Sequence, residues 1–337
     1  MARSKPELHP RVVAWGSKYS GSQYSCAANV DATGLRLQFD HELKEYFRLS
    51  GLSRSSSARP EYVQVALDQV FRVRVLLERS LISTIGRSSA SFDSKVSAVL
   101  ANSFYGFSKK QGTSLRMPLS TCQPTALCAG ACYAHDVLDA APGSIVRGAM
   151  NGWLAEQFER GGDVIRTEII RRLELHSRRA IRSAFGELKL LPSGYKRRAY
   201  IRFSHVGEIV AFPGFANALA RQVIELSEGK VDCVVYTRHR NAALLDPKLW
   251  IINFTLDERS LNRKAWVPPH ARIVYSAFGG RISPLAEVNF LEHHRHSHSP
   301  KTAGEGRICP ATLPETEVRS CDACCCNRCF VPPKPAG

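Results

Sequence analysis

The sequence predicts an α/β protein whose core is a partial parallel (β/α) barrel or an open parallel sheet. Strand-like and helix-like segments alternate through the second half of the 337 residues, and the strand-like segments are almost continuously apolar. Such strands are typical of a parallel sheet that helices cover through right-handed crossovers. Hydrophobic residues make up 44% of the chain and charged residues 23%, which excludes a mainly disordered chain, a collagen-like repeat and a coiled coil.

Four strands and the segments between them support this fold class. Strands are expected at 198–204, 231–237, 249–255 and 272–277. They are separated by a helix at 214–227 and by short helical or turn segments at 241–245 and 257–265. Four strands are too few for a complete eight-stranded barrel, so the barrel is expected to be partial.

Upstream of the strands, apolar periodicity predicts helices at 61–84, 144–160 and 163–185. The length favours two domains, or one large α/β domain with an appendage. We therefore expect a mostly helical or irregular N-terminal region (1–103), a cysteine loop with the parallel β/α core (104–290), and a His/Cys-rich C-terminal segment (291–337).

Charge and cysteine content are the two unusual features of the composition. The formal net charge is +16, and the chain has 11 cysteines. The chain has no run of 18 apolar residues and no apolar segment after its N-terminus, so we expect neither a membrane partner nor a secretory signal. A cytoplasmic protein is kept in a reducing compartment, where clustered cysteines are more often metal or cluster ligands than disulfides.

Three cysteines lie within 11 residues at Cys122, Cys128 and Cys132. Pro124, Gly130 and small residues between them allow the loop to fold back so that the three sulfurs converge. Three thiolates bound to a 4Fe–4S cluster leave one iron open for a further ligand. With a fourth ligand from elsewhere, the same thiolates could make a closed zinc site.

A second cysteine group near the C-terminus predicts another cluster or a zinc site. Two Cys-x2-Cys pairs and one upstream cysteine bring more thiols together than one four-coordinate metal needs. The preferred ligands are Cys309, Cys321, Cys324 and Cys329, with Cys326 as an alternative, and the choice among residues 324–326 stays open. The histidines between His293 and His298 are expected to form a solvated basic loop.

Polar residues follow the first three predicted strands, where a parallel sheet places its functional edge. These residues are Ser204, His205 and Glu208, then Thr237, Arg238 and His239, then Asp257 and Arg259. They could line the floor of a site for a polar ligand, or they could cap the helices that follow the strands.

Several of these segments resemble the phage gene product 88 domain family. The likeness begins with Ser108-Lys109-Lys110-Gln111-Gly112, continues through Met117-Pro118 and the cysteine loop to Cys132-Tyr133-Ala134, and includes Asn151. It extends through 201–208 and 236–241 to the cysteine-rich C-terminus, and covers roughly 104–330.

That family is similar to radical S-adenosylmethionine enzymes, which implies a radical-SAM-like fold with the cysteine loop at one end of the parallel barrel. By position, the resemblance implies that Cys122, Cys128 and Cys132 bind a 4Fe–4S cluster and that Gly207-Glu208 holds the amino group of S-adenosylmethionine. Ser204, Thr237 and Arg238 are further candidates for contact with the cofactor. The spacing here is Cys-x5-Cys-x3-Cys, whereas the radical enzymes usually have Cys-x3-Cys-x2-Cys.

Two functions of different classes follow. The first is a redox enzyme of phage or mobile-element type, in which one or two clusters and S-adenosylmethionine act on an anionic or nucleic-acid-related substrate, held by Arg238, Arg240 and Arg259. The second is a nucleic-acid-binding protein whose metal sites are structural, because residues 160–202 carry 12 basic and 4 acidic residues. The expected phosphate contacts are Arg166, Arg171, Arg172, Arg178, Arg179 and Arg182.

Overall fold

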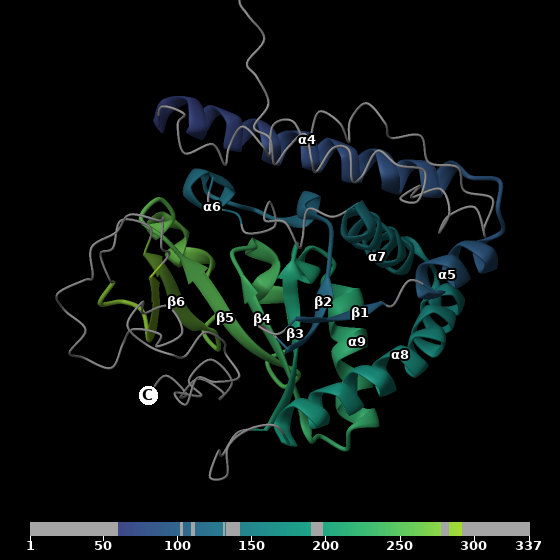
Figure 1. Ribbon diagram of the computed structural model, residues 1–337. Helices are drawn as coiled ribbons and strands as arrows, with labels where there is room; N and C mark the ends of the chain where they lie inside the picture. The colour runs from purple at the N-terminus through teal and green to yellow at the C-terminus, as the bar shows by residue number, and fades with distance from the viewer. Residues whose placement is uncertain are drawn as a thin grey trace, which may run out of the picture.

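The computed structural model describes residues 60–101, 104–108, 112–130, 132, 142–189, 198–277 and 283–291. These residues form an α/β structure around a seven-stranded sheet (Figure 1). The strands are β1 (Tyr105–Ser108), β2 (Gly112–Arg116), β3 (Ala199–Val206), β4 (Val231–Thr237), β5 (Trp250–Leu256), β6 (Arg272–Ala277) and β7 (Val288–Leu291).

The order of the strands in the sheet is their order in the chain. β1 pairs with β2 in an antiparallel hairpin, and every later neighbour from β2 to β7 is parallel. Parallel neighbours need a crossover connection, which often contains a helix. The helices are α4 (Pro60–Arg87), α5 (Phe92–Ala101), α6 (Ala126–Gly130), α7 (Pro142–Arg160), α8 (Asp163–Lys189) and α9 (Pro213–Leu226).

Short 3₁₀ helices also lie in the connections, and between β4 and β5 and between β5 and β6 they take the place of a longer helix. They are η2 (Leu119–Thr121), η4 (Ile209–Ala211), η5 (Arg240–Leu244) and η6 (Leu261–Trp266). Of the longer helices, α8 packs against β2 and β3, and α9 packs against β4. Helix α4 crosses the end of the sheet at which α6 lies, and contacts α6, α7 and η2 (Figure 1).

The pleat of the strands divides the apolar side chains between two faces of the sheet. All seven residues of β5 are buried, as expected of a central parallel strand. Its Phe254 belongs to the large core under the helices, together with Phe203 and Phe215. Tyr200 and Val234 belong to a smaller apolar cluster, because alternate residues of a strand point to opposite faces.

All four predicted strands are confirmed as β3 to β6. The predicted helices correspond to α4, α7, α8 and α9, with α8 continuing to Lys189. The sequence analysis did not find the β1–β2 hairpin, β7, α5 or α6. The hairpin was missed in part because of Gly112. Its φ of 70° lets the chain turn there, and the glycine interrupts the apolar pattern by which a strand is found.

Helices α4 and α5 precede the expected boundary at residue 103, yet they contribute to the same core as the sheet. Leu77, Leu81 and Ile85 of α4 and Val96 of α5 are at most 1% exposed and belong to the cluster that contains Phe254. The elements on both sides of residue 103 therefore bury one another. Within the described part of the chain, none of the helices combines the length and apolar character needed to span a lipid bilayer.

Candidate functional site at the carboxyl ends of the strands

The cysteine loop begins at the carboxyl end of β2. Three neighbouring parallel strands end beside it: β3 leads into Gly207-Glu208, β4 ends in Thr237, and β5 is followed by Asp257. The carboxyl ends of parallel strands share one edge of a sheet, which is the usual place for a ligand in α/β proteins. The polar residues expected after the strands are thus brought to one edge.

Gly207 joins the end of β3 to the start of the cysteine loop. Its φ is 69°, and a Cβ atom there would lie 2.4 Å from the carbonyl oxygen of Met117 and 2.5 Å from that of Pro118. The amide of Met117 also donates a hydrogen bond to Val206 O at 2.7 Å. Both the backbone conformation and the close approach require glycine at this position.

Glu208 connects the cysteine loop to β4. Its backbone N–H donates to Thr121 Oγ1 at 2.7 Å, one residue before Cys122. Its buried carboxylate accepts hydrogen bonds from the Thr237 hydroxyl and, at 3.4 Å, from the Arg238 amide. Burial raises the pKa of the Glu208 carboxyl above its usual value, although the hydrogen bonds from Thr237 and Arg238 oppose this effect.

A second carboxylate, Asp257, ties the cysteine loop to β5. It is completely buried and accepts hydrogen bonds from Thr125 Oγ1 at 2.5 Å and from Arg238 Nη1 at 2.7 Å. Thr125 Oγ1 in turn accepts the amide of Cys128 at 3.1 Å, as the N-cap of α6. The charge of Arg238, which the sequence analysis assigned to a substrate or cofactor, is thus paired inside the protein with Asp257.

His239 has the capping role that the sequence analysis considered for residues after the strands. Its Nδ1 accepts the amide hydrogen of Asn241 at 3.1 Å at the start of η5. Burial, with the nearby positive charge of Arg240, lowers the pKa of His239 to about 4. The imidazole is therefore neutral at pH 7, as an acceptor at Nδ1 requires.

Two further elements, η6 and α4, also hold the loop. Arg263 of η6 donates to the carbonyl oxygens of Gln123, at 2.6 Å, and Pro124, at 3.4 Å. Glu78 of α4 accepts the amide of Ser120 at 3.1 Å. The other carboxylate oxygen of Glu78 pairs with Arg74 Nε at 2.6 Å, and both side chains are at most 1% exposed.

The three thiols of this loop are partly buried and form no disulfide bond within the described residues. Burial raises the pKa of Cys122 well above its usual value, and the charges of Glu208, Cys132 and Cys128 raise it further. Cys122 and Cys132 also pack against the same apolar pair, Leu119 and Val206. Among the described residues, no group of three or more His, Cys, Asp or Glu side chains could hold one metal ion as they lie here.

Several predicted site residues cannot be placed in this way. Cys309, Cys321, Cys324, Cys326 and Cys329 lie outside the described residues, as does the histidine-rich segment. Ser204 lies near the carboxyl end of β3, but only its backbone is described. Cys233 of β4 is buried in the core, with its thiol 3.8 Å from Ala220 O.

The arginines expected to contact phosphate lie along α8, and most are already engaged. Arg166 donates to the carbonyl oxygens of Phe158 and Glu159, both at 3.1 Å. Arg171, Arg172 and Arg178 form ion pairs with glutamates three or four residues earlier, and Arg172 also pairs with Asp93 at 2.6 Å. Arg179 and Arg182 are exposed and have no ion pair within the described residues. Local pairing therefore neutralises much of this positive helix.

Sequence reasoning missed Thr125, Arg263 and Glu78, which hold the cysteine loop. The spacing of Arg74 and Glu78, four residues apart on a helix with a buried face, was the only available indication of the buried ion pair. Thr125 donates to Asp257, and Arg263 donates to the backbone of Gln123. The partners in both contacts are more than a hundred residues apart, so no local sequence pattern reveals them.

Comparisons of the chain with family models, with curated proteins and with solved structures found no match.

Proposed function

We propose that the chain is a cytoplasmic iron–sulfur protein with radical S-adenosylmethionine-like chemistry. Cys122, Cys128 and Cys132 would hold a 4Fe–4S cluster at the carboxyl end of the sheet. The observation that carries the proposal is the hydrogen bond from the Glu208 amide to Thr121, beside Cys122. It fixes the three-cysteine loop after β2 against the Gly-Glu pair after the next parallel strand, β3. The resemblance to the gene product 88 domain family implies the same two elements.

The strand order supports a partial barrel of the radical-SAM type. Strands β2 to β7 follow one another in the sheet as they do in the chain. A doubly wound sheet would reverse its direction at a switch point, whereas a barrel adds each strand beside the previous one. The loop after the first parallel strand and the Gly-Glu after the second therefore lie side by side.

The number and placement of the thiols suit a cluster. The charges of Cys128 and Cys132 both act on the thiol of Cys122, so the three cysteines of the loop lie near one another. Three thiolates leave one iron of a 4Fe–4S cluster open for a further ligand, which is the arrangement that the proposed chemistry needs.

When bound, such a cluster supplies an electron to the sulfonium of S-adenosylmethionine, which yields a carbon radical. The residues of the chain bind and orient the reactants. The Glu208 carboxylate is positioned by Thr237 and by the Arg238 amide, so that it can pair with an ammonium group. An ammonium next to Glu208 would lower its raised pKa and keep it ionised.

Anaerobic purification of the full chain, with iron and sulfide analysis and a visible spectrum, tests the cluster. We expect absorption near ~400 nm from thiolate-bound iron. The Cys128→Ala variant should lose the iron of one cluster, whereas Cys233→Ala, the control for a buried thiol, should keep it. Zinc in place of iron, or equal iron in all three proteins, would refute the assignment.

Cofactor chemistry requires a separate measurement. Under a strong reductant the protein should convert S-adenosylmethionine to 5′-deoxyadenosine and methionine. Glu208→Gln should keep the iron and its spectrum but lose most of this cleavage, because the ammonium of the cofactor loses its charged partner. Full cleavage by Glu208→Gln would contradict the role given to this residue.

A further inference from the structure

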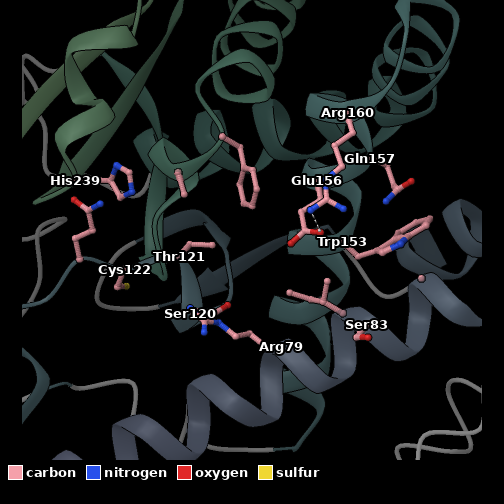
Figure 2. Close-up of a pocket in the computed structure, with 15 residues that line it drawn as sticks. Arg79, Ser83, Ser120, Thr121, Cys122, Trp153, Glu156, Gln157, Arg160 and His239 are labelled. Atoms are coloured by element: carbon pink, nitrogen blue, oxygen red, sulfur yellow. Dashed lines mark ion pairs between the residues drawn. The ribbon is translucent and has the colours of Figure 1, made fainter.

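A cleft extends from the cysteine loop between helices α4 and α7. Its volume is about 610 Å³, within the usual range for small-molecule sites. Figure 2 shows Cys122 and His239 at one end of this space and Trp153 with Ser83 towards the other. The cleft therefore leads from the proposed cluster site to a space lined by α4 and α7.

The charges along the cleft favour a ligand with one negative charge. Arg79 of α4 has no ion pair within the described residues. Arg160 of α7 has only a 3.5 Å contact with Glu156 and is 76% exposed (Figure 2). Two arginines, one glutamate and a neutral His239 give the lining a net charge of about +1, which a monoanion would balance.

Trp153 provides a second, independent indication of a ligand. Its side chain lines the cleft and the residue is 3% exposed, yet its buried indole N–H has no hydrogen-bond acceptor in the described structure. Buried donors are nearly always paired, so an unpaired one at a cleft wall calls for a partner. Gly86 leaves room beside it, because a Cβ atom there would lie 3.9 Å from Trp153 Nε1.

We propose that this cleft binds the substrate, and that the substrate is an organic carboxylate. The carboxylate pairs with Arg79 and Arg160, since guanidinium groups match carboxylates in two parallel hydrogen bonds. A carbonyl oxygen of the same molecule accepts the Trp153 N–H, and its apolar body packs against Ile82 and Phe212. This inference rests on the proposed function: the ligand is called a substrate because Cys122, a proposed cluster ligand, forms one end of the cleft.

Calorimetric titration of the full chain with phenylpyruvate tests the charge recognition. We expect binding that is at least about tenfold weaker for its methyl ester and for the Arg79→Gln variant, and partly restored in Arg79→Lys. Arg87→Gln removes the same charge from the last turn of α4 outside the cleft, and should bind as the wild type does. No measurable binding of phenylpyruvate, or equal weakening by both glutamine variants, would overturn the proposal.

A matched pair of acids tests the indole. Phenylpyruvate and 3-phenylpropanoate have the same length, but only the former has a keto oxygen. Trp153→Phe should weaken phenylpyruvate several-fold and leave 3-phenylpropanoate unchanged, since any loss of packing in the core would affect both acids alike. Gly86→Ala should also weaken phenylpyruvate, because its methyl group occupies the space beside Nε1. Equal effects on the two acids would contradict the hydrogen bond to Trp153.

Two further titrations distinguish this proposal from others. If Arg79→Gln weakens S-adenosylmethionine as much as phenylpyruvate, the cleft belongs to the cofactor and the proposal fails. If adenosine monophosphate binds more tightly than the acids and with the same dependence on Arg79, the site is for phosphate and the proposal also fails. If the acids bind as expected to a protein that contains no iron, the carboxylate site stands and the proposed radical chemistry falls.

Discussion

Replacement of Gly207 by alanine tests the close approach between β3 and the cysteine loop. The new methyl group would lie 2.4 Å from Met117 O and 2.5 Å from Pro118 O, and both of these are backbone atoms. Neither can move as the end of a flexible side chain would. The start of the cysteine loop or the Gly207-Glu208 turn must therefore shift.

The expected loss has two components. Holding alanine at a φ of 69° costs about 1–2 kcal/mol, because the left-handed region is unfavourable for residues with a Cβ atom. The clash adds about 1–3 kcal/mol, the usual cost of overpacking a well-packed site. Gly207→Ala should therefore reduce the free energy of unfolding by about 2–5 kcal/mol.

Gly229 is a matched control for the backbone component. Its φ is 70°, and a Cβ atom there meets nothing within 4 Å. Gly229→Ala should cost only the first component, about 1–2 kcal/mol. Urea unfolding of both variants at pH 7 measures the two losses. Equal losses would refute the argument that contact with Met117 and Pro118, rather than conformation alone, demands glycine at position 207.

Three other predictions concern buried charges at the same edge. Asp257→Asn leaves the buried Arg238 without its ion pair and should lower the free energy of unfolding by about 3–5 kcal/mol in urea titrations. The pKa of His239 is lowered from 6.5 to about 4, so the free energy of unfolding of the wild type should decrease as pH falls from 6.5 to 4. His239→Asn keeps an acceptor for the amide of Asn241 and should reduce that decrease. Burial raises the pKa of Glu208 above 4.5, so the protonated carboxyl stabilises the fold fully below pH 4.5. This stabilisation is lost as pH rises through the raised pKa. Glu208→Gln, which cannot ionise, should therefore gain stability relative to the wild type as pH rises.

Controls for these three predictions come from exposed groups. Glu228 forms an ion pair with Lys230 at the surface, so Glu228→Gln should leave the free energy of unfolding almost unchanged. A loss for Asp257→Asn as small as this would show that its pair with Arg238 is screened like a surface pair. Parallel curves of unfolding free energy against pH for wild type and variant would contradict the roles of His239 and Glu208.

Much of the fold could be predicted because its elements are encoded locally. Alternate residues of β5 from Trp250 to Leu256 form a continuous apolar face, and Pro213 and Gly229 lie at the two ends of α9. The residue pattern therefore located both elements to within one or two residues. The hairpin of β1 and β2 was missed because its strands are four and five residues long and rich in glycine and serine. Short strands of this kind depend on their partners more than on their own residue types.

The candidate site was only partly predictable. Position after a parallel strand pointed to Glu208 and Asp257, because the fold class fixes which edge of the sheet such residues share. That Asp257 accepts hydrogen bonds from both Arg238 and Thr125 could not be predicted, since these contacts join residues 19 and 132 positions apart. The cleft beside Trp153 depends on the packing of α4 on α7, which helical periodicity alone does not specify.

The match between strand order and chain order has a consequence for biosynthesis. As the polypeptide leaves the ribosome from its N-terminus, each parallel strand after β2 finds its neighbour already made. Asp257 and Arg263, which fasten the segment around Gln123, emerge more than a hundred residues after it. That segment therefore lacks these two contacts until residue 263 of the 337 has been translated.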